Sequence, residues 1–247
     1  MTRWKASLIH LLISLAIVGS IAAYILYFWY PPALLHMAKA DKLLGLVGGI
    51  DLVVGPLLTL LVYKHGKASL RMDLTVVALI QAAFLSLGLY TLYQSRPVFL
   101  VASSRSFDLV FANEVVPEAL ARAHDPQFMT LGIGKPKLVG AILPTDKKER
   151  DRLTSIALAG GGDIQMMPEY YVDFSAVVPD IIAHALPLKP GKEASAAAIS
   201  VMIDAAKDYG RNPADLGFVH MGSSRGFAAM LVDAKTGQIV GPVNVDP

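Results

Sequence analysis

Apolar positions are spread unevenly along the chain, and their distribution divides it into two parts. Three long apolar stretches occur before residue 94, at about 7–30, 43–63 and 74–93. A helix needs about 20 apolar residues to cross the roughly 30 Å hydrocarbon core of a bilayer. The pattern therefore predicts a membrane anchor of three transmembrane helices in residues 1–93.

Residues 94–247 show short apolar segments separated by turns instead. Segments rich in Val, Phe and Leu predict strands at 98–102, 107–112, 137–143, 218–221, 227–232 and 238–240. Helices are expected at 117–123, 146–159, 175–185 and 193–209, with Thr145 as the N-cap of the second. Strands at both ends with helices between them predict one α+β domain on an antiparallel sheet.

The first apolar stretch is predicted to remain in the mature protein. A secretory signal has an apolar region of about 7–15 residues and a small-residue cleavage site. Here the stretch is longer and ends in Tyr27-Phe28-Trp29-Tyr30-Pro31-Pro32. This ending is typical of aromatic residues at a membrane interface followed by a helix stop.

Basic residues predict how the three helices are oriented. Five lie before the first helix or between the second and third, namely Arg3, Lys5, Lys64, Lys67 and Arg71. The other loop has two, Lys39 and Lys42. Because basic residues accumulate in cytoplasmic loops, the N-terminus is expected in the cytoplasm and residues 94–247 on the far side.

The second predicted helix carries an acidic residue, Asp51, near its middle. A carboxylate at this depth costs several kcal/mol unless it is paired or faces the interior of a helix bundle. On a helical wheel it shares one arc with three small or polar residues. Together they form what we call the polar stripe: Gly48, Asp51, Gly55 and Thr59.

Two interpretations of Asp51 follow from this pattern. In the first, Asp51 forms a hydrogen bond with Ser20 or Ser86, which fall at a similar depth in the other two helices, and only fixes their packing. In the second, the polar stripe receives a helix from another protein, and Asp51 faces a polar or charged group on it. The pattern alone leaves both open.

Composition and motifs indicate no catalytic, cofactor or metal site. The absence of cysteine excludes a disulfide scaffold, a thiolate metal site and a cysteine nucleophile. Residues 94–247 have fifteen Lys/Arg against seventeen Asp/Glu, which excludes a charge-driven nucleic-acid binder. Gly222-Ser223-Ser224-Arg225-Gly226 matches the nucleophile elbow of hydrolases, but a strand follows it and no histidine occurs after His220. We therefore expect a hairpin turn there.

Three segments carry a family resemblance: RWKASLIHL at 3–11, GIDLVVGPLLT at 49–59 and YTLYQSRPV at 90–98. They are similar to the type IV pilin accessory proteins of the TfpX/TfpZ family. The similarity is dense over about residues 3–101 and looser beyond. Members of this family are small inner-membrane proteins that are associated with type IV pilins and are not known as enzymes.

The resemblance implies a chaperone-like accessory protein of the bacterial inner membrane, with residues 94–247 in the periplasm. Its expected partners are the lipid bilayer, the major type IV pilin and other inner-membrane proteins of pilus assembly. Because pilins generally have a glutamate and a free amino terminus near the start of their membrane helix, Asp51 is a candidate to pair with that amine. The alternative is a ligand-sensing membrane protein, which would signal through a partner because its cytoplasmic segments are short.

Overall fold

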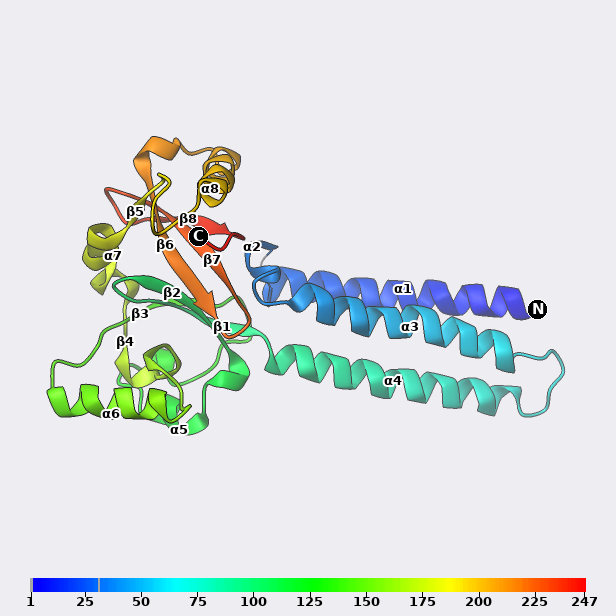
Figure 1. The fold of residues 1–247 in the computed structure, drawn as a ribbon. Coiled ribbons are helices and arrows are strands. Elements are labelled where there is room, and N and C mark those ends of the chain that lie inside the picture. Colours follow the sequence, from blue (N-terminus) through cyan, green and yellow to red (C-terminus); the bar gives the residue numbers. More distant parts are fainter. Residues whose placement is uncertain (1, 31) are drawn as a thin grey trace. The chain divides into compact units, whose positions relative to one another are not determined.

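The computed structural model describes residues 2–30 and 32–247, which form two compact units. The helical unit comprises the residues up to Phe28 together with Lys39–Ser95. The sheet domain comprises Trp29–Ala38 and Arg96–Pro247. Figure 1 shows the elements of both. The helix stop expected at Pro31 lies outside the described residues.

The helical unit contains three long helices: α1 (Arg3–Phe28), α3 (Ala40–Val62) and α4 (Leu70–Gln94). All three are long and apolar enough to cross a membrane, and they lie where the three spans were predicted. Each begins three or four residues earlier than predicted. The prediction followed apolar residues alone, whereas the hydrogen bonding of a helix can continue into the polar residues that flank them. α3 packs against both neighbours, whereas α1 and α4 make few contacts with each other (Figure 1).

The sheet domain is built on eight strands within the described residues. They are β1 (Pro97–Ala102), β2 (Ser106–Phe111), β3 (Lys137–Ala141), β4 (Tyr171–Val172), β5 (Leu186–Pro187), β6 (Leu216–Ser223), β7 (Gly226–Asp233) and β8 (Ile239–Val243). Their order is β4-β3-β1-β2-β6-β7-β8, and β5 also pairs with β6. The six predicted strands are confirmed. β4 and β5 were not predicted because two residues are too few to show an alternating pattern.

The sheet is mixed, so the prediction of an antiparallel sheet was wrong in part. Short turns join β1 to β2 and β6 to β7 to β8, and these pairs are antiparallel. β3 instead returns beside β1 in the parallel direction, and β6 returns beside β2 in the same way. Both arrive after long connections containing helices, which permit a parallel neighbour.

Four helices in this domain confirm those predicted, with shorter bounds: α5 (Pro117–Ala121), α6 (Lys147–Leu158), α7 (Val178–His184) and α8 (Ala196–Asp208). The N-cap of α6 is Asp146 rather than Thr145, because the Asp146 carboxylate accepts a 3.0 Å hydrogen bond from the Glu149 N–H. Shorter helical turns were not predicted: α2 (Pro32–Leu35), η1 (Ala112–Glu114), η2 (Pro126–Phe128), η3 (Ile164–Met166), η4 (Pro168–Tyr170), η5 (Phe174–Ala176) and η6 (Pro213–Asp215).

Two apolar clusters form the core of the sheet domain. One surrounds the rings of Phe99, Phe128 and Tyr171, with ring centroids 5.1 and 5.8 Å from that of Tyr171. The other packs Met202 of α8 against Phe218 and the strands β6–β8. Burial of these apolar side chains supplies the main driving force for folding of the domain.

The loop at 29–38 is part of the sheet domain, although it connects two membrane-spanning helices. Arg225, in the turn between β6 and β7, donates a 3.1 Å hydrogen bond to the Ala38 carbonyl and lies 3.5 Å from the centroid of the Phe111 ring. It also forms a hydrogen bond with Tyr30, which is fully buried. Burial raises the pKa of Tyr30 to about 12, so its hydroxyl remains neutral at physiological pH.

Candidate functional site

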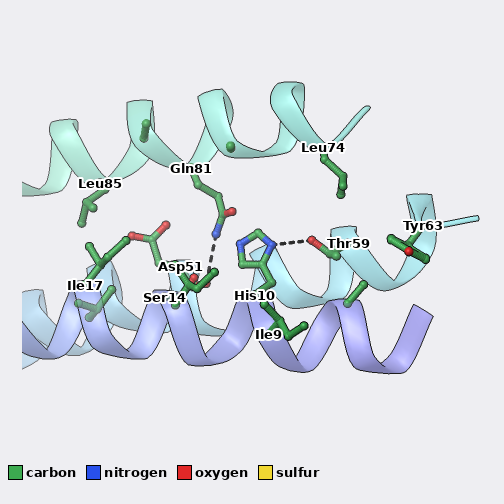
Figure 2. A pocket seen from close by; sticks show the side chains of 15 residues that line it. Ile9, His10, Ser14, Ile17, Asp51, Thr59, Tyr63, Leu74, Gln81 and Leu85 are labelled. Carbon is green, nitrogen blue, oxygen red and sulfur yellow. Dashed lines mark hydrogen bonds between the residues drawn. The ribbon is translucent and has the colours of Figure 1, made fainter. Parts of the chain in front are cut away.

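The three long helices surround a cavity of about 460 Å³ in the helical unit (Figure 2). Its walls are mostly apolar, with Ile9, Ile13 and Ile17 from α1 and Leu74 and Leu85 from α4. A few polar side chains also line it: His10, Ser14, Asp51, Thr59 and Gln81. An apolar cavity with a small number of convergent polar groups is the usual form of a binding site.

Asp51 is the acidic residue that lines this cavity. Its side chain is 4% exposed, and neither carboxylate oxygen has a hydrogen-bond partner among the described residues. Figure 2 shows the carboxylate in the space between α1 and α4. Burying a carboxylate without a partner costs free energy. A hydrogen-bond donor or a cation that binds beside Asp51 would offset this cost.

Two interhelical hydrogen bonds hold the polar groups around Asp51. Nδ1 of His10 lies 2.6 Å from the Thr59 hydroxyl, which joins α1 to α3. The Gln81 amide donates to the backbone carbonyl of Asp51 at 3.3 Å, which joins α4 to α3. These contacts occupy His10, Thr59 and Gln81 (Figure 2). The two carboxylate oxygens of Asp51 stay buried without a hydrogen-bond partner among the described residues.

The two glycines of the polar stripe lie where neighbouring helices approach α3 closely. A Cβ at Gly48 would lie 3.3 Å from Val18, and one at Gly55 would overlap the side-chain amide of Gln81. Small residues allow such close approach between membrane helices. The structure therefore places Gly48 and Gly55 against α1 and α4 of the same chain, while Asp51 and Thr59 line the cavity.

The structure does not bring Ser20 and Ser86 to Asp51. Both side chains are exposed, and the Ser20 hydroxyl donates to the Ala16 carbonyl of its own helix. Ser14 lines the cavity in place of Ser20, because α1 begins earlier than predicted and its middle lies nearer Ser14. Gln81 was also missed, although it interrupts the apolar middle of α4 and could have been found from that signal.

The serine motif at 222–226 forms a hairpin turn, as predicted. Ser223 ends β6 and pairs with Gly226, which begins β7. The Ser223 hydroxyl accepts hydrogen bonds from the backbone N–H groups of Arg225 and Gly226, both at 3.1 Å. Within the described residues, no cluster of three or more histidine or acidic side chains is placed to hold a metal ion.

Replacing Gly88 by leucine should weaken the packing of α4 on α3. A Cβ at Gly88 would lie 2.6 Å from a methyl group of Val47, and such overpacking costs about 1–3 kcal/mol. Gly49→Leu is the matched control, because a Cβ there meets nothing within 4 Å. We expect a lower thermal aggregation temperature in detergent for Gly88→Leu alone. Equal losses in both variants would contradict the observed helix packing.

The chain is similar in sequence to several known proteins. The family model for the fimbrial assembly protein FimB matches residues 1–32. Two fimbrial assembly proteins of Dichelobacter nodosus, from serogroups E1 and I, are each 28% identical over 186 residues, covering 74% of this chain and 72% of the relative. A third, from serogroups C1 and C2, is 31% identical over 121 residues, covering 48% of this chain and 92% of the relative. No solved structure matches the chain significantly.

Proposed function

The chain belongs to the family of fimbrial assembly proteins, and we propose that it is a non-enzymatic accessory protein that binds a type IV pilin. In this role it would hold the pilin in the inner membrane and support its stability or its assembly into pili. The family likeness supports a role in pilus assembly. The distribution of basic residues supports a cytoplasmic N-terminus and a periplasmic sheet domain.

The observation that carries the proposal is the unpartnered carboxylate of Asp51 in an apolar cavity. Before assembly, a pilin has an apolar helix in the inner membrane and a globular head in the periplasm. Such a helix fits apolar walls, and a positively charged or hydrogen-bond-donating group on it would satisfy Asp51. The free amino terminus of the pilin is our candidate for that group.

The residues of the polar stripe have two different roles in this proposal. Asp51 and Thr59 line the cavity and are the proposed contact with the pilin helix. Gly48 and Gly55 hold α3 close to α1 and α4, and so position the carboxylate. A contact of this kind involves binding and positioning alone, which agrees with a family of assembly proteins.

Site-specific photocrosslinking in cells with their native pilin tests the proposal. The crosslinking residue is placed at Ile13 of α1 and at Ala82 of α4, which both line the cavity. Leu61 is the control, because it is exposed on α3 and does not line the cavity. We expect an adduct of pilin mass from positions 13 and 82 and none from position 61.

Two outcomes would overturn this assignment. If the protein is expressed and inserted but gives no pilin adduct from either cavity position, the cavity is not the pilin site. If position 61 gives an adduct as strong as those from 13 and 82, the contact is not specific to the cavity. Copurification of pilin with the full chain then shows separately whether the two proteins associate at all.

A further inference from the structure

Ile133 and Phe227 are two strongly exposed apolar side chains of the sheet domain. Ile133, in the loop before β3, is 69% exposed, and Phe227, at the start of β7, is 68% exposed. Single exposed apolar residues are normal on a protein surface. Ile133 and Phe227 differ from such residues because their neighbours in the sequence form hydrogen bonds with the segments that lead into or out of the long helices.

The backbone beside Ile133 is hydrogen-bonded to Arg96, the second residue after α4 ends. Arg96 is buried, and its Nε and Nη2 atoms both donate to the carbonyl of Gly132, at 3.2 and 3.1 Å. Gln94, the last residue of α4, is only two positions before Arg96. The loop that carries Ile133 is therefore tied to the point where the chain leaves a membrane-spanning helix.

The turn beside Phe227 is hydrogen-bonded to the segment that connects α1 to α3. Arg225 forms hydrogen bonds with the carbonyl of Ala38 and with Tyr30. Ala38 is two positions before α3 begins, and Tyr30 is two positions after α1 ends. Each of the two segments is thus hydrogen-bonded to residues two positions from the end of a long helix, that of Ile133 for α4 and that of Phe227 for α1 and α3.

We propose that Ile133 and Phe227 insert into the interfacial region of the bilayer, so that the sheet domain has its own contact with the lipid surface. The hydrogen bonds of Arg96 and Arg225 tie the backbone next to both side chains to residues that lie two positions from the end of a membrane-spanning helix. Apolar and aromatic side chains are favoured at this depth. Lys135 lies two residues after Ile133, and Lys39 follows Ala38, whose carbonyl accepts from Arg225; both supply the positive charge that suits phosphate headgroups. This contact is independent of pilin binding.

The absence of cysteine makes the proposal directly testable. Ile133→Cys and Phe227→Cys each provide one attachment point for a nitroxide label on the full chain. The labelled protein is reconstituted, without pilin, in vesicles of phosphatidylethanolamine and phosphatidylglycerol. Collision with dissolved oxygen and with a water-soluble nickel chelate then reports the surroundings of each label. Leu158→Cys is the matched control, because Leu158 is 84% exposed on α6.

We expect the labels at 133 and 227 to be severalfold less accessible to the nickel chelate, and more accessible to oxygen, than the label at 158. Nickel accessibility equal to that at 158 would overturn the proposal. A second measurement adds pilin to the same vesicles. If both labels are open to water before the addition and are protected only after it, the surface binds protein rather than lipid, and the proposal is wrong.

Discussion

Replacing Asp51 by leucine should reduce pilin binding at least tenfold while leaving the helical unit as stable as before or more stable. The carboxylate is buried without a partner, so its removal relieves a cost to the free chain. Leucine suits the apolar walls of the cavity. In the complex, however, removing one member of a buried charged pair costs about 2–5 kcal/mol. Stability and binding are therefore expected to change in opposite directions.

Two quantities measured on one preparation check this expectation. The first is the amount of pilin that copurifies with the full chain. The second is the thermal aggregation temperature of the full chain in detergent. Ser14→Ala is the control, because Ser14 lines the same cavity without carrying a charge. Asp51→Asn keeps the size of the side chain and separates charge from shape.

Two other results would contradict the proposed contact between Asp51 and the pilin. If Asp51→Leu lowers thermal stability and pilin recovery together, the carboxylate serves the packing of this chain. If pilin recovery is unchanged in Asp51→Leu and Asp51→Asn, the proposed contact is wrong even where the protein still binds pilin elsewhere.

The spans were predictable from sequence because each depends on the character of one continuous segment. The direction in which each span faces was not, because rotation of a helix is set by its neighbours. Counting residues gave Ser20 and Ser86 the depth of Asp51, yet both side chains lie away from the cavity. Gly48 and Gly55 were recognised as small, but only the structure shows that Val18 and Gln81 fill the space beside them.

In the sheet too, the pairs formed by strands close in sequence were predictable, and the pairs formed by strands distant in sequence were not. The hairpin at Ser223 and Gly226 was predictable, because a short turn with a strand on each side permits only an antiparallel pair. The parallel neighbours β1–β3 and β2–β6 are joined by long segments whose course is decided by packing across the domain. The inclusion of Tyr30 and Ala38 in that domain also depends on contacts distant in sequence, above all those of Arg225.

The second large effect is expected from Arg96, one of the largest fully buried side chains of the chain. Arg96→Ala should lower the free energy of unfolding of the sheet domain by about 3–5 kcal/mol. The substitution leaves a cavity, and it leaves the Gly132 carbonyl without the two N–H groups that it accepts from. Arg105, exposed in the turn between β1 and β2, is the control, and Arg105→Ala should change stability by less than about 0.5 kcal/mol.

Urea unfolding of the full chain in detergent measures these differences. Trp29 belongs to the sheet domain, so its fluorescence follows the unfolding once Trp4 of α1 is replaced by phenylalanine. A loss below about 1 kcal/mol in Arg96→Ala would show that the buried guanidinium is not needed to hold the loop at Gly132.

A third variant separates the two causes of the expected loss. Arg96→Met retains much of the side-chain volume but donates no hydrogen bond, so it should cost about 1–3 kcal/mol, the penalty for a buried carbonyl left unsatisfied. The additional loss in Arg96→Ala then measures the cavity. In both variants the loop at Gly132 loses its bond to the chain beside α4. A nitroxide at position 133 should therefore become more mobile in Arg96→Met even under conditions where the domain remains folded.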